Sequence, residues 1–254
     1  MAITNRTLKK HNQVIVKSND IIQKAQHQLT EQQQDILAYM VAEIKADDEP
    51  NKVYTFSIRN YCEDNNLDNT SGYYYQSIKD DIEVIDTQRM FLIDDKNSHI
   101  LKRLRWLNIY HINVKSGEIM YNFHQDIQPY LFQLGNRKTI IKYKQRAALS
   151  GKYAKCLYEL MKSYQNMETV ITIPLDRLKF VMNAEKYKRF PDFRRWALEP
   201  AIDEINRVGD IIVKARYEKG DKGKAITQVG FFIYRADGLI AEKRQEKAEE
   251  RLGY

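Results

Sequence analysis

The feature that most constrains the fold is an order of predicted elements that occurs twice along the chain. In each half, apolar spacing and turn residues predict a helix, a short strand, two helices, a strand, a loop and a strand. We interpret the two halves as an internal duplication that joins near Gly135. A helix-turn-helix followed by a β-hairpin is a winged-helix module. The sequence therefore predicts an α+β fold with two tandem winged-helix domains.

Four parts are expected along the chain: a basic N-terminal arm, a first domain, a second domain and a charged tail. Their predicted ranges are 1–17, 18–135, 136–236 and 237–254. The strands that begin at Met90 and Ile211 are expected to be equivalent, because each follows a helix that ends in two inward isoleucines. The hairpin of the first domain is predicted from residues 100–114 and 119–123.

The segment 187–206 joins a basic, aromatic half to an apolar half with helical spacing. Such a helix can bury one face and offer guanidinium groups to the major groove, although a surface helix with some arginines has the same pattern. Pro200 should kink the helix or begin a new one. Residues 192–199 would then read DNA and residues 201–208 would be buried. Phe193 and Trp196 are expected in the core.

Composition adds limits on the class of protein. The 254 residues carry a formal net charge of +7, which suits a polyanionic partner but also an ordinary basic protein. The two cysteines, Cys62 and Cys156, predict neither a disulfide framework nor a zinc site. No secretory signal and no apolar run of roughly 20 residues is found, so a cytoplasmic protein without membrane association is expected.

Three segments carry a resemblance to a known family: residues 14–44, 151–164 and 190–206. In this order they resemble the iteron-binding plasmid replication initiators, the RepB/RepE/π-like Rep_3 superfamily. The resemblance implies two winged-helix domains and binding to double-stranded direct repeats (iterons) at a plasmid origin in a bacterial cytoplasm. It further implies opening of adjacent DNA and recruitment of the host initiator and replicative helicase. A dimer would repress its own gene through an inverted repeat in the operator.

The resemblance also implies a division of labour. The first domain would supply the dimer surface and DNA backbone contacts, and the second would carry the main iteron recognition. By position, residues 190–206 match the recognition helix of the second domain. Arg189, Arg194 and Arg195 would then be the main base and phosphate contacts.

Candidate DNA-binding residues lie on the segments that are expected to face DNA. They are Lys186, Lys188, Arg189, Asp192, Arg194 and Arg195 around the recognition helix, Lys102, Arg103 and Arg105 on the first hairpin, Arg216, Lys222 and Lys224 on the second hairpin, Tyr73, Tyr75 and Lys79 on the third helix of the first domain, and Lys142, Lys144 and Arg146 near the join. On a strand, the last three would share one face. Adjacent helical residues point about 100° apart, so at most one of Arg194 and Arg195 reads a base well.

Two other functions fit parts of the pattern. A tandem winged-helix transcription regulator without a replication role would have the same fold and charge. A rolling-circle nicking initiator would need a metal-binding histidine pair. The segment most similar to such a motif, residues 110–113, lacks the second histidine. The five histidines show no ligand spacing, so we expect no enzyme activity, no metal and no cofactor.

Overall fold

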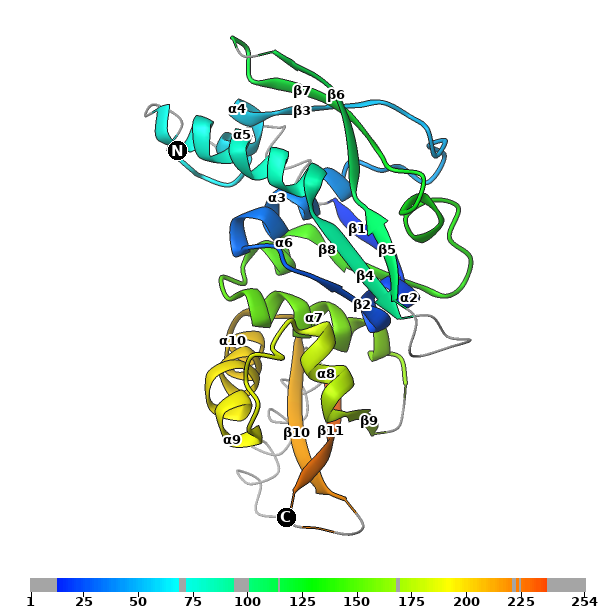
Figure 1. Cartoon of the computed structure of the whole chain (residues 1–254), viewed down its shortest axis with the longest axis vertical. Helices are drawn as coiled ribbons and strands as arrows, with labels where there is room; N and C mark the ends of the chain where they lie inside the picture. The colour runs from blue at the N-terminus through cyan, green and yellow to red at the C-terminus, as the bar shows by residue number, and fades with distance from the viewer. Residues whose placement is uncertain are drawn as a thin grey trace, which may run out of the picture. The chain divides into compact units, whose positions relative to one another are not determined.

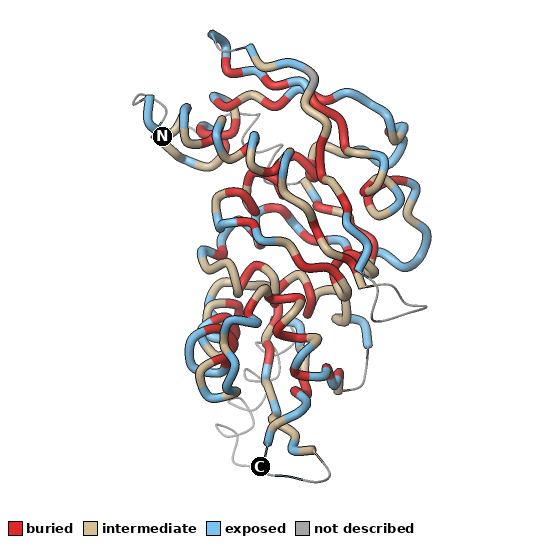
Figure 2. Tube along the Cα trace, viewed as in Figure 1, coloured by how far each residue is buried: buried red, intermediate tan, exposed pale blue. Residues whose placement is uncertain are grey.

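The computed structural model describes residues 13–68, 72–93, 101–113, 115–167, 170–220, 223 and 225–236. The predicted turn at 94–98, the first twelve residues of the predicted arm and the predicted tail lie outside these ranges. The chain divides into two compact units, Met1–Ala147 and Ala148–Tyr254, and each has its own buried core (Figures 1 and 2). The predicted α+β fold with two winged-helix domains is confirmed.

The first unit contains fourteen described elements in chain order. They are β1 (Val14–Ser18), α2 (Asn19–Lys24), β2 (Ala25–His27), α3 (Glu31–Val41), β3 (Tyr54–Ser57), α4 (Ile58–Asp64), α5 (Gly72–Thr87), β4 (Arg89–Ile93), β5 (Leu101–Arg105), β6 (Leu107–Asn113), β7 (Glu118–Phe123), a 3-10 turn (Gln128–Tyr130), β8 (Lys138–Lys142) and α6 (Tyr143–Ala147). Helix α3 begins with the predicted capping box, in which Thr30 and Gln33 each bond the other's backbone N–H.

The winged helix of the first unit consists of α3, α4 and α5 with the sheet β6-β7-β3. Ile78, Ile82 and Ile85 of α5 are fully buried, as their spacing predicts. Strands β4 and β5 are inserted in the chain between α5 and the wing hairpin β6–β7, and with β2 they form a second sheet of order β2-β4-β5, the inserted sheet. The wing is therefore not continuous with the helix that precedes it.

The inserted sheet corrects two predictions about the first hairpin. The predicted strand 100–114 is divided at Trp106: β5 pairs with β4 through Met90↔Leu104, whereas β6 pairs with β7 through Leu107↔Phe123. In the second unit the hairpin strands β10 (Ile211–Lys219) and β11 (Ile226–Arg235) form a sheet with β9 (Ile171–Pro174), in the order β10-β11-β9. The counterpart of β10 is thus β6 and not the strand that contains Met90. The spacing of apolar residues along the sequence did not reveal that β6 and β10 are equivalent, because strand pairing is decided by contacts between residues distant in sequence.

The second unit has the predicted order of elements. They are α7 (Lys152–Tyr164), β9 (Ile171–Pro174), α8 (Leu175–Val181), α9 (Phe190–Phe193), a π-helical turn (Arg194–Leu198), α10 (Glu199–Val208), β10 (Ile211–Lys219) and β11 (Ile226–Arg235). Val213, Val229 and Phe231 of the hairpin are fully buried. Helix α10 packs on α7 and on β10, and α9 and α10 (yellow) lie beside the long hairpin in Figure 1.

The join between the two halves lies later than residues 135/136. Strand β8 pairs antiparallel with β1, from Val14↔Lys142 to Ser18↔Lys138, and so belongs to the first unit. The part of the predicted arm from Val14 onward is therefore a strand of the first unit's β1-β8 sheet. The boundary between the units follows α6, at Ala147/Ala148.

Candidate nucleic-acid interface

A helical segment with a wide turn runs from Phe190 to Val208 in the second unit. Its buried residues form two adjacent rows with a spacing of four positions: Phe193, Ala197, Ala201 and Ile205 in one, and Leu198 and Ile202 in the other. In a regular α-helix such a repeat would rotate the buried stripe by about 40° per step. The π turn between α9 and α10 takes up part of that rotation. The buried side chains at both ends of the segment therefore pack into the same core.

Pro200 explains the position of the wide turn. Proline has no N–H to donate to the preceding turn, and its ring collides with the carbonyl four residues back in a regular α-helix. Here the N–H of Glu199 donates to the carbonyl of Arg194, five residues back. The predicted break at Pro200 is thus a π turn directly before it, and α10 begins at Glu199 with Pro200 in its first turn.

Polar contacts fix α10 to its neighbours. The carboxylate of Glu204 accepts hydrogen bonds from the backbone N–H and hydroxyl of Ser150 and from the N–H of Gly151, at the start of α7. The side chain of Asn206 donates to the carbonyl of Val213 at 3.0 Å and accepts from its N–H at 2.7 Å. These contacts and the buried stripe hold the exposed face of the segment in a defined position.

Three arginines lie on the exposed side of this segment, each with a different neighbour. Arg189 forms two hydrogen bonds with Asp192, at 2.8 and 3.0 Å. The Nε of Arg194 donates to Glu199 at 2.6 Å, and its guanidinium lies 4.9 Å from the ring centre of Tyr217. The guanidinium of Arg195 lies 4.8 Å from the ring centre of Trp196. Hydrogen bonding to Arg189 holds the pKa of Asp192 below its usual range.

Trp196 corrects a prediction, because 58% of its surface is exposed. Phe193, by contrast, is fully buried as expected. The spacing of the apolar residues could have predicted this exposure. Position 196 falls between Phe193 and Ala197, outside the four-residue repeat of buried positions. An exposed tryptophan therefore lies among the candidate arginines.

Two lysines precede the segment. Lys186 is exposed and lies 4.9 Å from the ring centre of Tyr187, and Lys188 is exposed as well. The buried Lys179 donates to the backbone carbonyl of Lys188 at 3.1 Å. This bond ties the loop before α9 to α8.

The wing of the second unit carries further candidates. Arg216 is exposed on β10, pairs with Glu218 at 2.6 Å and lies 6.0 Å from the ring centre of Phe232. Lys222 and Lys224 lie outside the described residues. The wing strand therefore carries an exposed guanidinium that is already paired with a carboxylate.

The first unit presents weaker candidates on α5. Tyr73 is 74% exposed, Tyr75 is half-buried, and Lys79 lies 3.8 Å from Glu83. Tyr74 is half-buried as well. The exposed part of this helix is thus more aromatic than cationic.

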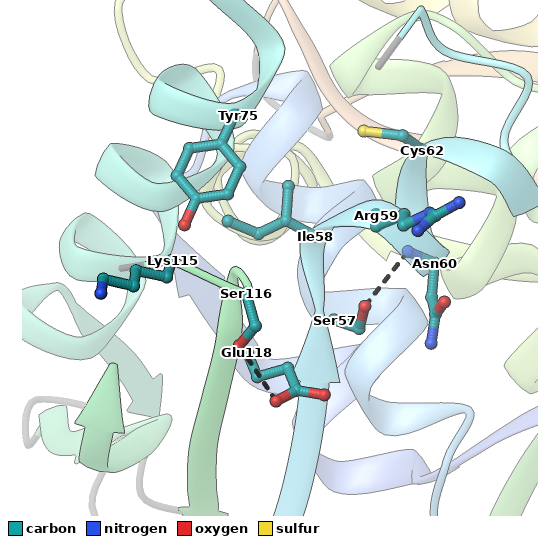
Figure 3. Close-up of a pocket in the computed structure, with 9 residues that line it drawn as sticks. All are labelled: Ser57, Ile58, Arg59, Asn60, Cys62, Tyr75, Lys115, Ser116 and Glu118. Atoms are coloured by element: carbon teal, nitrogen blue, oxygen red, sulfur yellow. Dashed lines mark hydrogen bonds between the residues drawn. The ribbon is translucent and has the colours of Figure 1, made fainter. Parts of the chain in front are cut away.

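A pocket of about 670 Å³ lies between α4, α5 and the wing turn of the first unit (Figure 3). Tyr75 points from α5 toward Lys115 and Ser116. Gly117 of the wing turn has a φ of +68°, and a Cβ there would lie 2.6 Å from Cε2 of Tyr75. Lys115 was missed as a candidate although it lies in the predicted turn, where a wing commonly meets phosphate.

The basic cluster at Lys102, Arg103 and Arg105 is not on the wing. It lies on β5, in the inserted sheet, where Arg103 lies 5.7 Å from the ring centre of Phe91. Arg105 approaches Asp86 of α5 at 3.5 Å. The prediction that these three cations share the first hairpin is wrong, because their strand pairs with β4 instead of β7.

The basic run near the join is also not one face. The strand ends at Lys142 and the backbone continues as α6, so the alternation expected for Lys142, Lys144 and Arg146 is lost. Lys142 and Lys144 are exposed. Arg146 is buried and pairs with Asp35 at 2.9 Å. Burial takes Arg146 out of any surface that could meet DNA.

Within the described ranges, no three side chains of His, Cys, Asp and Glu lie together in a way that could hold a metal ion. Of the helices that the structure describes, none has the length and apolar character needed to cross a membrane.

Comparison with known structures gives the same architecture. The crystal structure of the Pi initiator protein in complex with iteron DNA matches with a TM-score of 0.69 and 20% sequence identity, covering 89% of this chain and 99% of that one. Domains 2 and 3 of RctB match more weakly, with a TM-score of 0.41 and 14% identity, covering 80% of this chain and 81% of that one. The first of these supports the tandem winged-helix fold.

Comparison with protein families adds a direct assignment. Residues 14–162 match the family described as initiator replication protein, WH1, and residues 174–233 match initiator Rep protein, WH2. The first match covers the described part of the first unit and extends into α7, the second match lies within the second unit, and together they confirm the resemblance to replication initiators. The chain therefore belongs to the initiator replication protein family.

Proposed function

We propose that this protein initiates plasmid replication by binding sequence-specifically to double-stranded iterons at the origin. The observation that carries the proposal is the exposed face of residues 189–196, where Arg189, Arg194 and Arg195 project from a helix whose other face is buried. Its membership of the initiator family and the likeness of its fold to the Pi protein, which was crystallised with iteron DNA, support it.

The second unit is proposed as the main reader of sequence. The start of a helix that enters the major groove can place arginine side chains against guanine O6 and N7, while a wing follows the phosphates. Lys186 and Lys188 are exposed just before the helix and Arg216 is exposed on the wing strand, and we expect these three side chains to contact phosphates. Asp192 would act through Arg189, because its carboxylate holds that guanidinium.

The first unit is proposed to contact the DNA backbone and to form the dimer surface. Its helix α5 has exposed Asp80 and Glu83 and a single lysine, Lys79, so it is poorly suited to enter a groove lined with phosphates. Tyr73, Tyr75 and the wing residue Lys115 are better suited to phosphate oxygens at the rim. Lys102, Arg103, Lys142 and Lys144 remain candidates for contacts away from the helix, and Arg105 a weaker one because Asp86 lies beside it.

Three further steps belong to the same proposal. The monomer would help to open DNA beside the iterons and recruit the host initiator and the replicative helicase. A dimer would repress the gene through an operator with an inverted repeat. The protein would act in the bacterial cytoplasm on the plasmid, within the nucleoid. The support for these steps is the resemblance to iteron-binding initiators.

A replication test separates this function from that of a transcription regulator. A vector that carries the gene and its flanking DNA, without another origin, should replicate after transformation. Changing Arg194 and Arg195 together to alanine should abolish replication, whereas Arg207→Ala, an exposed arginine about 18 Å further along the helix, should not. Failure of the unaltered vector to replicate, together with specific binding to the flanking DNA, would identify a regulator instead.

Salt dependence tests the extent of the DNA contact. If six or more phosphates are contacted, affinity for the repeats should fall by about 10³-fold or more between about 50 and 200 mM salt. A dissociation constant that hardly changes over this range would contradict a DNA surface that extends over both units.

A further inference from the structure

We infer that Arg195 and Trp196 form one reading unit, which recognises a guanine and a neighbouring thymine in the major groove, while Arg194 contacts the phosphates. This inference rests on the proposed function, because it concerns how the same helix would read double-stranded DNA. It assigns a role to Trp196, the exposed tryptophan of this segment.

The first step is the state of the three arginines before DNA binds. Arg189 and Arg194 each donate to a carboxylate, that of Asp192 and that of Glu199. Asp192 occupies Nε and Nη2 of Arg189, and Glu199 occupies Nε of Arg194, so neither guanidinium has all of its N–H groups free for a base. Among the described residues, no carboxylate pairs with Arg195, and its recorded contact is the ring of Trp196. The N–H groups of Arg195 are therefore the ones ready for the O6 and N7 of guanine.

The second step is the geometry of the π turn. The wider turn places five residues where an α-helix places about four. Three consecutive side chains, 194–196, are exposed between the buried Phe193 and Ala197. Arg194 is turned toward Tyr217 of the wing strand β10, to which Glu199 also bonds at 3.3 Å. Arg194 is thus held on the wing side, where phosphates are expected, and Arg195 and Trp196 are held together.

The third step is the chemistry of Trp196. One face of its indole is covered by the guanidinium of Arg195 at 4.8 Å, and 58% of the residue remains exposed. The indole offers one N–H donor and no acceptor, so most of its exposed surface is apolar. In the major groove its apolar surface matches the C5 methyl group of thymine. Because the two side chains are adjacent and stacked, the bases they read should be neighbours.

The experiment uses the full chain and a pool of duplex DNA with a randomised central region. Wild-type protein and the variants Arg195→Ala, Trp196→Ala, Arg194→Ala and Arg207→Ala each select from this pool, and the selected duplexes are sequenced. Arg195→Ala should lose a guanine preference at one position, by about 5- to 150-fold in binding. Trp196→Ala should lose a thymine preference at the neighbouring position. Arg194→Ala and Arg207→Ala should retain both preferences.

Modified bases then test each contact on the selected duplex. Replacing the thymine by uracil removes only the methyl group, and should weaken wild-type binding by about fourfold. The same replacement should leave Trp196→Ala unaffected, and Trp196→Phe should retain sensitivity to it. Replacing the guanine by 7-deazaguanine should weaken wild-type binding but not Arg195→Ala.

The results of these experiments distinguish a failure of this inference from a failure of the proposed function. If the wild-type protein enriches no motif, specific DNA binding itself fails. If a motif is enriched and both preferences survive in Arg195→Ala and Trp196→Ala, the reading unit alone is overturned. Loss of the guanine preference in Arg194→Ala instead would assign the base contact to the other arginine. Thermal unfolding of each variant checks folding, which the exposure of these side chains should leave intact.

Discussion

The carboxylate of Glu204, in the middle of α10, lies at the first turn of α7 and accepts a hydrogen bond from the N–H of Gly151 at 3.1 Å. Gly151 is the N-cap residue of α7 and has no side chain to cap the helix itself. A carboxylate from a second helix thus takes the place of a capping residue, and it sits where the positive end of the helix dipole favours negative charge. This contact joins the reading segment to the core of its unit.

The Glu204 contact predicts an acid-dependent part of the stability. Burial raises the pKa of Glu204, but hydrogen bonds from Ser150 and Gly151 and the charge of Arg207 outweigh it, so the pKa lies below its ordinary value of 4.5. A lowered folded-state pKa gives stability that is present above the unfolded value and lost as pH falls. Glu204→Gln should therefore lower the free energy of unfolding by about 1 kcal/mol at pH 7.

Urea unfolding of the wild type and Glu204→Gln at several pH values checks this prediction. The difference between the two proteins should shrink below pH 4.5, where the wild-type carboxyl group becomes protonated. Asp203→Asn, an exposed carboxylate on the same helix, is the matched control and should change little. A difference that is constant with pH would show that the charge of Glu204 is not involved.

Glu199 predicts a change in DNA affinity. Its carboxylate pairs with Arg194 and is 41% exposed, close to where phosphates would lie. Glu199→Gln removes a negative charge and releases Arg194, so affinity for any duplex should rise by about fivefold and the salt slope should steepen by about one unit. Titration of a specific and an unrelated duplex at several salt concentrations measures both. Asp203→Asn should have a smaller effect, and weaker binding by Glu199→Gln would contradict a DNA-facing position.

Arg146 predicts a structural effect without a DNA effect. Its side chain is 4% exposed and pairs with Asp35, which is 29% exposed. Removing one partner of a buried pair leaves the other charge uncompensated. Arg146→Ala should therefore lower the free energy of unfolding by about 3 kcal/mol, whereas the exposed Lys144→Ala should change it little. If Arg146→Ala were as stable as the wild type but bound DNA more weakly, Arg146 would return to the candidate interface.

Gly117 and Tyr75 predict a coupled pair in the first unit. Gly117→Ala should destabilise the protein by about 1–3 kcal/mol, because its φ of +68° disfavours a side chain. Part of the cost should come from the contact of the new methyl group with the Tyr75 ring at 2.6 Å. In a Tyr75→Ala background the same change should cost about 1 kcal/mol less. Unfolding of the four proteins of this cycle measures the coupling, and strict additivity would show that only the backbone strain matters.

Local patterns were sufficient for much of the fold. The capping box at Thr30, the isoleucine stripe of α5 and the inward residues of α7 are all as expected, because each depends on neighbours within a few turns. The repeated order of elements likewise predicted two winged-helix domains. The reading segment itself was found from its basic half and its apolar half.

The errors have a common physical origin in contacts between residues distant in sequence. Lys102, Arg103 and Arg105 are not on the wing because β5 pairs with β4. The boundary between the units lies later than predicted because β8 pairs with β1. From the sequence, Arg146 was expected to be one more exposed cation. In the structure it lies on α6 against Asp35, which is more than a hundred residues earlier in the chain.

The sequence by itself determined the fold class, the order of the helices and strands, and the helix that carries the candidate arginines. Only the tertiary structure decided which of those arginines are already held by carboxylates and that Trp196 is exposed. The reason is that helical periodicity is encoded every three to four residues, whereas the partners of a side chain depend on which distant elements pack beside it. At Arg194 that distant partner is Tyr217 of the wing, and at Glu204 it is the start of α7.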